Sequence, residues 1–352
     1  MSSQFGAGRA TLNDVAARAG VSRTTASFVL AGKAQEHRIA EATRARVIEA
    51  AIALDYSPNL LVHSMQAGRT HIVTFFSAFR HRFPGDLYMD RLSTAVEHAA
   101  GRRGYNVLVY CDFEVTPDVT YGFLNGGHAD GLLFFAPLPT DPLLPYLRSS
   151  RLPTVLVNAQ DPEGVLPSVR DDAESGMRQV ADALAERGHR RIALLVQHGW
   201  DQRDSTPRAA LLADRMAQAG AETTVVDVPD GRPKEVVAAL STLMSAPHPP
   251  TAVFCWHDRL AYTLLEACED LGIAVPERLS VVGYDGLRWP AGTRHTAASV
   301  VVDLDALADA AVDLLLGYIQ GRVAGAAATL LPVRFDPGTS LAPALGCGPQ
   351  AR

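Results

Sequence analysis

The chain has 352 residues, of which 47% are hydrophobic, enough for two or three domains with buried cores. Its net charge of −6 disfavours a nucleic-acid partner for the chain as a whole. No apolar run approaches the roughly 20 residues that span a bilayer, and residues 1–10 lack the apolar core of a signal peptide. We therefore expect a cytoplasmic protein without a membrane partner, with residues 1–10 as a flexible leader.

The charge is unevenly distributed along the chain. Residues 1–70 contain eight basic and five acidic side chains, a net charge of +3, whereas the remaining chain carries −9. A small basic region on an acidic body is suited to localised binding of phosphates.

Residues 11–30 predict two short helices joined by a tight Gly-Val-Ser turn. Thr11 and Asp14 can form a capping box, Gly20 can end the first helix in a left-handed conformation, and Ser22 can cap the second. In the second helix an apolar face points inward, and four side chains point outward: Arg23, Thr24, Ser27 and Phe28. This is the layout of a helix-turn-helix that reads the major groove of DNA. An ordinary two-helix corner is the alternative.

A third helix is predicted over residues 41–54, with Val47, Ile48, Ala51 and Leu54 on one face. Three motifs then resemble the headpiece of the lactose-repressor (LacI/GalR) family of bacterial transcription regulators. They are T-L-N-D-V-A-A-R-A-G-V-S at residues 11–22, E-A-T-R-A-R-V at 41–47 and Y-S-P-N at 56–59. The resemblance covers residues 11–70 specifically and continues weakly to about residue 340.

The resemblance implies DNA-binding roles for residues of the second helix. Arg23 and Thr24 occupy the positions that discriminate operator sequence, and arginine suits bidentate contact with guanine. Ser22, Thr25 and Ser27 would lie near phosphates, although capping and packing explain these small residues equally well. Ala40 stands where the family has a helix-capping serine.

Phe28 departs from the family, which has a guanine-contacting arginine at this position. A phenyl ring cannot replace those hydrogen bonds, but it can pack on a thymine methyl group. We therefore expect an operator half-site that differs from the usual family sequence at this base.

The family also implies a hinge helix after the Y-x-P motif, which folds on DNA. Met65 occupies the position of a leucine that wedges into the minor groove, and Asn59 would contact the DNA backbone. A core-packing turn of helix is the alternative for residues 60–65.

From about residue 71, short apolar runs alternate with helical stretches, which predicts parallel sheets covered by helices on both faces. No glycine-rich nucleotide motif follows any of these strands, so we expect no cofactor. The region resembles the two-lobed, periplasmic-binding-protein-like effector domain of the same family. The fold class is thus an all-α helix-turn-helix headpiece followed by an α/β two-lobed domain.

Ligands of parallel sheets lie beyond the carboxyl ends of the strands. That rule selects Asn158 after one strand, Trp256, His257 and Asp258 after a second, and Tyr284 and Asp285 after a third. Packing between lobes is an alternative for Trp256, and helix capping is an alternative for Asp258. The family match adds Arg208 and Tyr88 as effector-binding residues.

Flat aromatic rings with polar side chains suit hydroxyl-rich ligands. Asn158 and His257 replace an aspartate and an asparagine common in sugar-responsive members. These two replacements count against a sugar, but a sugar-like effector remains the leading interpretation, and a purine-like corepressor is the alternative.

The domain assignment is a headpiece over 11–57, a hinge over 58–70, an effector-binding and dimerisation domain over 71–345 and a tail over 346–352. The first lobe comprises about 71–169 and 298–329, and the second about 170–297 and 330–345. The tail lacks a tetramerising heptad, which favours a homodimer on a palindromic double-stranded operator.

The sequence bears on three functional classes. A ligand-responsive repressor leads; a binding or sensor protein without operator specificity is the alternative. An enzyme is disfavoured because the histidines form no catalytic or metal motif, and the pair Asp171–Asp172 is interpreted as helix caps. The four scattered cysteines, Cys111, Cys255, Cys268 and Cys347, have no metal-ligand spacing and are expected to be reduced.

Overall fold

The computed structural model describes residues 10–56, 68–77, 86–110, 116–197 and 206–345. The chain divides into two compact units, a smaller one that ends at Thr70 and a larger one that begins at His71. Among the described residues, no helix is long and apolar enough to cross a membrane. Residues 1–9 of the predicted leader, residues 58–67 of the predicted hinge and the predicted tail at 346–352 lie outside the described residues.

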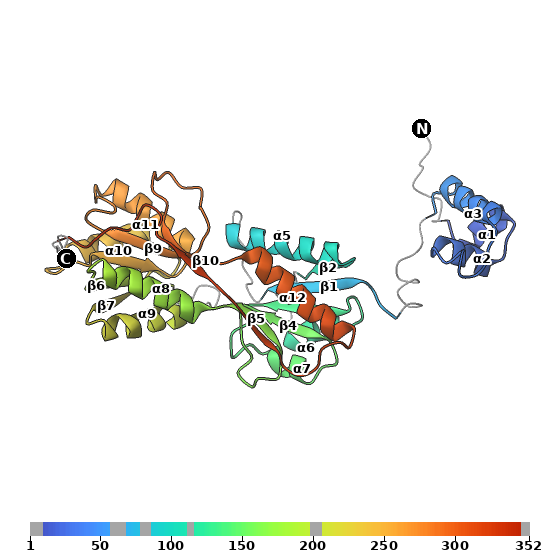
Figure 1. The fold of residues 1–352 in the computed structure, drawn as a ribbon, viewed down its shortest axis with the longest axis horizontal. Helices are drawn as coiled ribbons and strands as arrows, with labels where there is room; N and C mark the ends of the chain where they lie inside the picture. Colours follow the sequence, from blue (N-terminus) through green and yellow to red (C-terminus); the bar gives the residue numbers. More distant parts are fainter. Residues whose placement is uncertain (1–9, 57–67, 78–85, 111–115, 198–205, 346–352) are drawn as a thin grey trace. The chain divides into compact units, whose positions relative to one another are not determined.

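The smaller unit is built from three helices, α1 (Leu12–Ala19), α2 (Arg23–Leu30) and α3 (Glu41–Ala53) (Figure 1). The predicted caps are confirmed: Thr11 and Asp14 form the capping box, Gly20 ends α1 with a φ of 66°, and the Ser22 hydroxyl accepts the Thr25 amide. Apolar side chains of all three helices and of Ala34, in the loop after α2, form one core: Val15, Ala16, Ala19, Ala26, Val29, Ala34, Val47, Ala50 and Ala51.

The prediction that Ile48 lies on the same face of α3 as Val47 and Ala51 is wrong. Ile48 is 39% exposed, and Ala50 is buried on that face instead. Val47, Ala50 and Ala51 are spaced i, i+3, i+4, whereas Ile48 lies about 100° further round the helix.

The larger unit contains two six-stranded sheets. The first has the order β11-β5-β4-β3-β1-β2 and the second the order β12-β10-β9-β8-β6-β7, and within them only β12 pairs antiparallel, with β10. The first sheet comprises β1 (Ile72–Ser77), β2 (Asn106–Val109), β3 (Gly131–Phe135), β4 (Thr154–Val157), β5 (Ser168–Asp171) and β11 (Ala328–Leu331). The second comprises β6 (Arg191–Val196), β7 (Glu222–Asp227), β8 (Ala252–Cys255), β9 (Ser280–Asp285), β10 (Ala298–Val301) and β12 (Arg334–Asp336).

Helices cover both faces of each sheet, which explains the continuous apolar runs of the inner strands. On the first sheet, α5 (Leu87–Arg102) and α12 (Leu304–Ile319) pack on one face, and α6 (Pro117–Leu124) and α7 (Leu144–Arg148) on the other. On the second sheet, α8 (Ala173–Glu186) and α9 (Thr206–Gln218) face α10 (Pro233–Met244) and α11 (Asp258–Asp270) across the strands. In β6, Ile192 and Leu194 pack toward α8 and α9, while Ala193 and Leu195 pack toward α10 and α11.

The chain passes between the two lobes three times. The passages follow β5, which ends at Asp171, β10, which ends at Val301, and β11, which ends at Leu331. These passages lie two to four residues later than the expected lobe boundaries, because β5 and β11 belong to the first sheet and β10 belongs to the second. The two sheets therefore end side by side at these connections, where side chains of both lobes can meet.

Candidate functional site

The outward face of α2 begins with two exposed side chains, Arg23 and Thr24. Ser22, which precedes them, accepts the Thr25 amide at 3.1 Å, and the two hydroxyl oxygens are 2.8 Å apart. Both hydroxyls thus contribute to the helix cap. Ser27 is half-buried on the same helix.

Phe28 does not extend freely from α2. Its ring lies 3.5 Å from that of His37, centroid to centroid, with an angle of 11° between the planes. Phe28 is half-buried and His37 is exposed, so the imidazole covers part of the phenyl ring. No local pattern in the sequence predicts this contact, because His37 lies in a loop without periodicity. Asn59 and Met65, the remaining predicted DNA-binding residues, lie outside the described residues.

In the larger unit, three strands of the two sheets end in residues with unusual backbone conformation. Ala136 after β3, Asn158 after β4 and Asp285 at the end of β9 have φ values of 47°, 53° and 110°. Non-glycine residues with positive φ are strained and cluster at functional sites. Two of these three were selected from the sequence by the strand-end rule.

Arg208 on α9 lies between carboxylates of both sheets. Its guanidinium nitrogens are 4.0 Å from an Asp171 oxygen and 3.9 Å from an Asp285 oxygen, and its carbon lies 3.6 Å from the centre of the Tyr284 ring. Burial lowers the pKa of Arg208, but Tyr284, Asp171 and Asp285 outweigh burial and raise it. The guanidinium is therefore a permanent cation that links a first-sheet strand to a second-sheet strand.

Tyr284 connects the same two strands. It is completely buried, and its hydroxyl donates a hydrogen bond to the Asp171 carboxylate. Burial raises the pKa of Tyr284, Arg208 opposes that shift, and Asp171 raises it further. The phenol thus keeps the proton that it donates.

The interpretation of the pair Asp171–Asp172 as helix caps holds for Asp172 and is wrong for Asp171. Asp172 caps α8 by accepting the Ser175 amide at 2.9 Å, whereas Asp171 turns toward Arg208 and Tyr284. The sequence signal available was its place at the end of β5, but that strand was not predicted.

Tyr88 and Asn158 form a second polar pair, within the first lobe. The Asn158 amide donates to the Tyr88 hydroxyl at 2.6 Å, and the Asn158 carbonyl oxygen is buried with no hydrogen-bond partner among the described residues. Burial, then Asp285 and Asp171, raise the pKa of Tyr88, although Arg208 and Asn158 oppose them. The charges of Asp171, Asp285 and Arg208 therefore act on the Tyr88 hydroxyl.

Trp256 and His257 follow β8 and are fixed by polar contacts. The indole N–H of Trp256 donates to the Gln197 side chain at 2.9 Å, and Arg208 donates to its carbonyl oxygen at 3.1 Å. His257 is the cap of α11, because its Nδ1 accepts the Leu260 amide at 3.0 Å. The capping role suggested for Asp258 therefore belongs to His257.

Asp258 is buried and supports the segment after β9. Its carboxylate accepts hydrogen bonds from the Leu287 amide at 2.5 Å and the Ser299 hydroxyl at 2.7 Å, while that hydroxyl accepts the Gly286 amide. Burial and the nearby Asp285 raise the pKa of Asp258, although the donated hydrogen bonds oppose them. This network holds the backbone that directly follows the strained Asp285.

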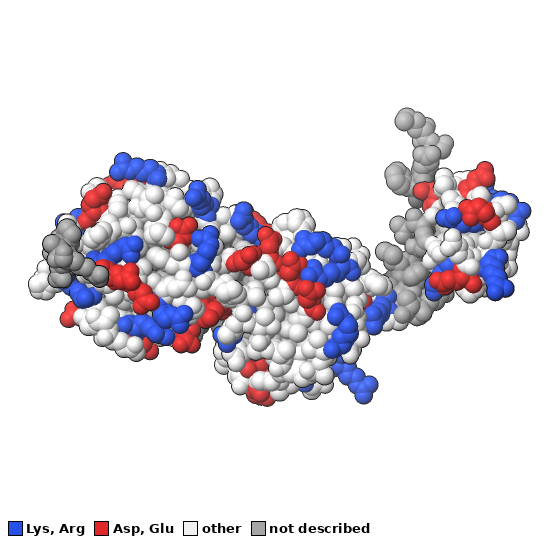
Figure 2. Space-filling view, in the orientation of Figure 1, with Lys and Arg blue, Asp and Glu red and all other residues white. Residues whose placement is uncertain are grey.

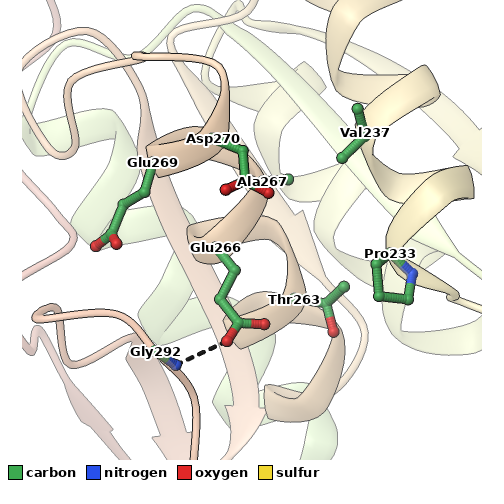
Figure 3. Close-up of a pocket in the computed structure, with 8 residues that line it drawn as sticks. All are labelled: Pro233, Val237, Thr263, Glu266, Ala267, Glu269, Asp270 and Gly292. Atoms are coloured by element: carbon green, nitrogen blue, oxygen red, sulfur yellow. Dashed lines mark hydrogen bonds between the residues drawn. The ribbon is translucent and has the colours of Figure 1, made fainter.

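A separate pocket of about 260 Å³ lies between α10 and α11 (Figure 3). Two of its acidic side chains hold the loop after β9: Glu266 accepts the Gly292 amide at 2.7 Å, and Glu269 accepts the Thr293 hydroxyl at 2.7 Å. The hydrogen bond from Thr293 also lowers the pKa of Glu269. Among the described residues, no group of three or more His, Cys, Asp or Glu side chains could hold a metal ion.

Charged side chains of both signs lie side by side over the larger unit in Figure 2. Some of them form ion pairs, such as Arg103 with Asp309 and Asp313 at 2.7 and 2.6 Å. The face in view thus offers no broad basic patch to a polyanion.

Comparisons with known proteins agree with both units. The family model for bacterial regulatory proteins of the lacI family matches residues 11–59, and that for a periplasmic binding protein-like domain matches residues 181–341. The chain is 28% identical over 324 residues to the HTH-type transcriptional repressor PurR of Escherichia coli (strain SE11), covering 89% of this chain and 91% of that protein.

Solved structures extend the likeness over most of the chain. The transcriptional regulator CelR in complex with cellobiose is 27% identical, has a TM-score of 0.67, and the match covers 94% of this chain and 100% of that one. The lac repressor dimer bound to operator and the anti-inducer ONPF is 22% identical with a TM-score of 0.82, covering 95% and 100%. The predicted fold class is confirmed.

Proposed function

Because this chain joins a LacI-family helix-turn-helix domain to a periplasmic-binding-protein-like domain, we propose that it is a transcriptional repressor controlled by a small ligand. It binds a palindromic operator as a homodimer, as the lac repressor dimer binds its operator. The observation that carries the proposal is the firmly capped α2, which presents exposed Arg23 and Thr24 at its first turn. This function includes no catalysis. The protein acts in the cytoplasm, where its operator lies.

On DNA, α2 enters the major groove. Arg23 reads guanine, and Thr24 contacts the neighbouring base. Ser22, Thr25 and Ser27 lie near phosphates, and Asn59 contacts the DNA backbone. Met65 of each subunit wedges into the central minor-groove step.

The effector site comprises Tyr88, Asn158, Arg208, Trp256, His257 and Asp285. Its one described guanidinium, that of Arg208, already faces two carboxylates, Asp171 and Asp285, so it offers little attraction to an anion. The buried carbonyl oxygen of Asn158 can accept a hydrogen bond from a ligand hydroxyl. These features support a neutral, hydroxyl-rich, sugar-like effector, consistent with the cellobiose complex of CelR.

Control by the effector follows from where these residues lie. Asp171 belongs to the first sheet, whereas Arg208 and Tyr284 belong to the second lobe, so a ligand among them changes the free energy of the contact between lobes. A ligand that prefers one lobe arrangement shifts the population of DNA-binding dimers by its difference in affinity.

The first experiment selects bound duplexes from a random DNA library and confirms them by gel shift at two salt concentrations. Recovery of a palindrome whose half-site changes when Arg23 is replaced supports the proposal. Weak, strongly salt-dependent binding without a preferred sequence, both with and without candidate effectors, would instead identify a sensor protein without operator specificity.

The second experiment identifies the effector by thermal shift and calorimetry with neutral sugars, sugar phosphates and purines. We expect a neutral sugar to bind, and Asp285→Ala and Arg208→Ala to abolish that binding. Glu266→Gln, in the pocket of Figure 3, is the control and should leave the affinity unchanged. Undiminished affinity in both site variants would refute the site, and purine binding would replace the sugar-like effector by a corepressor.

A further inference from the structure

The aromatic stack of the headpiece contains an exposed hydrogen-bonding ring. Phe28 and His37 are nearly parallel, with centroids 3.5 Å apart, and only His37 is exposed. Phe28 lies four residues after Thr24 on α2, so the two side chains share one face of the helix. The stack therefore places an imidazole over the face of α2 that Phe28 shares with Thr24.

The loop that carries His37 is held firmly in this position. Ala34 is buried in the core of the headpiece, and the Lys33 amide donates to the Phe28 carbonyl at 2.9 Å. The Ile39 amide donates to the Ala34 carbonyl at 2.8 Å, which closes the loop around His37. These contacts define the backbone of the loop on both sides of the imidazole.

The charge of the loop suits a surface that approaches DNA. Lys33 and Arg38 are exposed on either side of His37, and Glu36 is the one acidic residue between them. Cations at this place favour nearby phosphates without reading sequence. The chemistry that reads a base edge, a directed N–H donor, is present in the imidazole and absent from the phenyl ring beneath it.

We propose that His37 is a base-reading residue of the headpiece and that Phe28 is its positioning residue. The imidazole donates a hydrogen bond to a purine N7 or guanine O6 in the major groove, next to the bases contacted by Arg23 and Thr24. This inference rests on the proposed function, since it requires that α2 enter the major groove of an operator.

The test uses the full-length protein and two variants that separate the ring stack from the hydrogen bond. His37→Phe retains a stacked ring but has no donor, and Phe28→Leu retains an apolar side chain but removes the stack. The matched control is His128→Phe, because His128 stacks on Phe123 in the larger unit, with centroids 4.6 Å apart and 20° between planes. For each protein, base preference is measured by selection, and affinity by gel shift on the selected operator and on unrelated DNA.

We expect His37→Phe to relax the preference at one symmetry-related base-pair position and to weaken operator binding on the order of tenfold. Binding to unrelated DNA and the melting temperature should stay unchanged. Phe28→Leu should relax the preference at the same base pair, and His128→Phe should alter neither. This shared base pair is the readout that a purely structural stack would not produce.

Two results would overturn the inference while leaving the proposed function intact. An unchanged base preference in His37→Phe would show that the imidazole reads no base. An equal loss on operator and unrelated DNA would assign His37 to phosphate contact or to headpiece stability, which the melting temperature distinguishes. If the unaltered protein selects no sequence at all, the proposed function itself has failed.

Discussion

At the scale of single residues, the polar cluster around Arg208 depends on mutual compensation. One half-buried guanidinium faces two carboxylates, and the Tyr284 hydroxyl supplies a further donor to Asp171. A buried carboxylate that loses a donor keeps its desolvation cost without its partner. Each member of the cluster therefore affects the stability of the ligand-free protein as well as the binding of the ligand.

Replacing Tyr284 by Phe should lower the free energy of unfolding by about 1–3 kcal/mol, because the buried Asp171 carboxylate loses a hydrogen-bond donor. Urea unfolding of the ligand-free protein measures the change. Tyr318→Phe is the control, since the Tyr318 hydroxyl donates to the Gly325 carbonyl at an exposed site. An equal effect of both substitutions would contradict the special place of Tyr284.

At the scale of elements, α3 begins without a side-chain cap. Ala40 is its N-cap residue and forms no side-chain hydrogen bond, whereas α1 and α2 are capped by Thr11 and Ser22. Serine at this place would accept one of the free amides of the first turn.

Ala40→Ser should therefore stabilise the headpiece by about 1 kcal/mol. Calorimetric melting of the headpiece transition measures the gain. Ala40→Gly is the control, because it adds no acceptor side chain. A serine variant no more stable than the glycine variant would show that the capping geometry is not reached.

The connection between β4 and β5 is held by one buried carboxylate. Asp161 is 2% exposed and accepts hydrogen bonds from Arg148 at 2.6 Å and from the Val165 and Leu166 amides at 2.9 and 3.0 Å. Burial alone would raise its pKa, but these donors outweigh burial and hold the pKa at about 2.

The depressed pKa of Asp161 predicts a pH dependence of stability. An aspartate in the unfolded chain has a pKa of about 3.9, so the native carboxylate contributes about 2 kcal/mol above that pH and loses this contribution as the pH falls toward 2. The stability difference between the unaltered protein and Asp161→Asn, measured by urea unfolding, should shrink from pH 6 to pH 3. Glu163→Gln, which alters the exposed partner of Arg148, should show little difference at any pH.

At the scale of the whole molecule, the two units carry charge of opposite sign. Residues 1–70 have a net charge of +3, and the remaining residues have −9. The acidic larger unit repels DNA, so binding depends on the headpieces, and two headpieces in a dimer double their attraction.

Operator affinity should therefore fall steeply with salt, by about a thousandfold between roughly 50 and 200 mM for six phosphate contacts, while binding of a neutral effector changes little. Gel shifts and calorimetry across this range compare the two. Lys33→Gln should reduce the slope of the logarithm of affinity against the logarithm of salt by about 1 per headpiece. Arg334→Gln, in the larger unit, should leave the slope unchanged.

The sequence by itself determined the features whose cause is local. Caps, turns and the apolar face of a helix depend on residues three or four positions apart, so the three headpiece helices and the start of α2 were predicted. Strands buried on both faces are continuous apolar runs, and most of them were predicted for the same reason. The ends of these strands selected Asn158 and Asp285 in advance.

Only the tertiary structure decided which distant residues meet. Asp171 faces Arg208 because β5 completes the first sheet while α9 covers the second, and no local pattern records that order. His37 lies on Phe28 because the buried Ala34 anchors the loop between them. The exposure of Ile48 follows from how α3 rotates against its neighbours. Such contacts depend on packing between elements, which the spacing of residues along the chain does not specify.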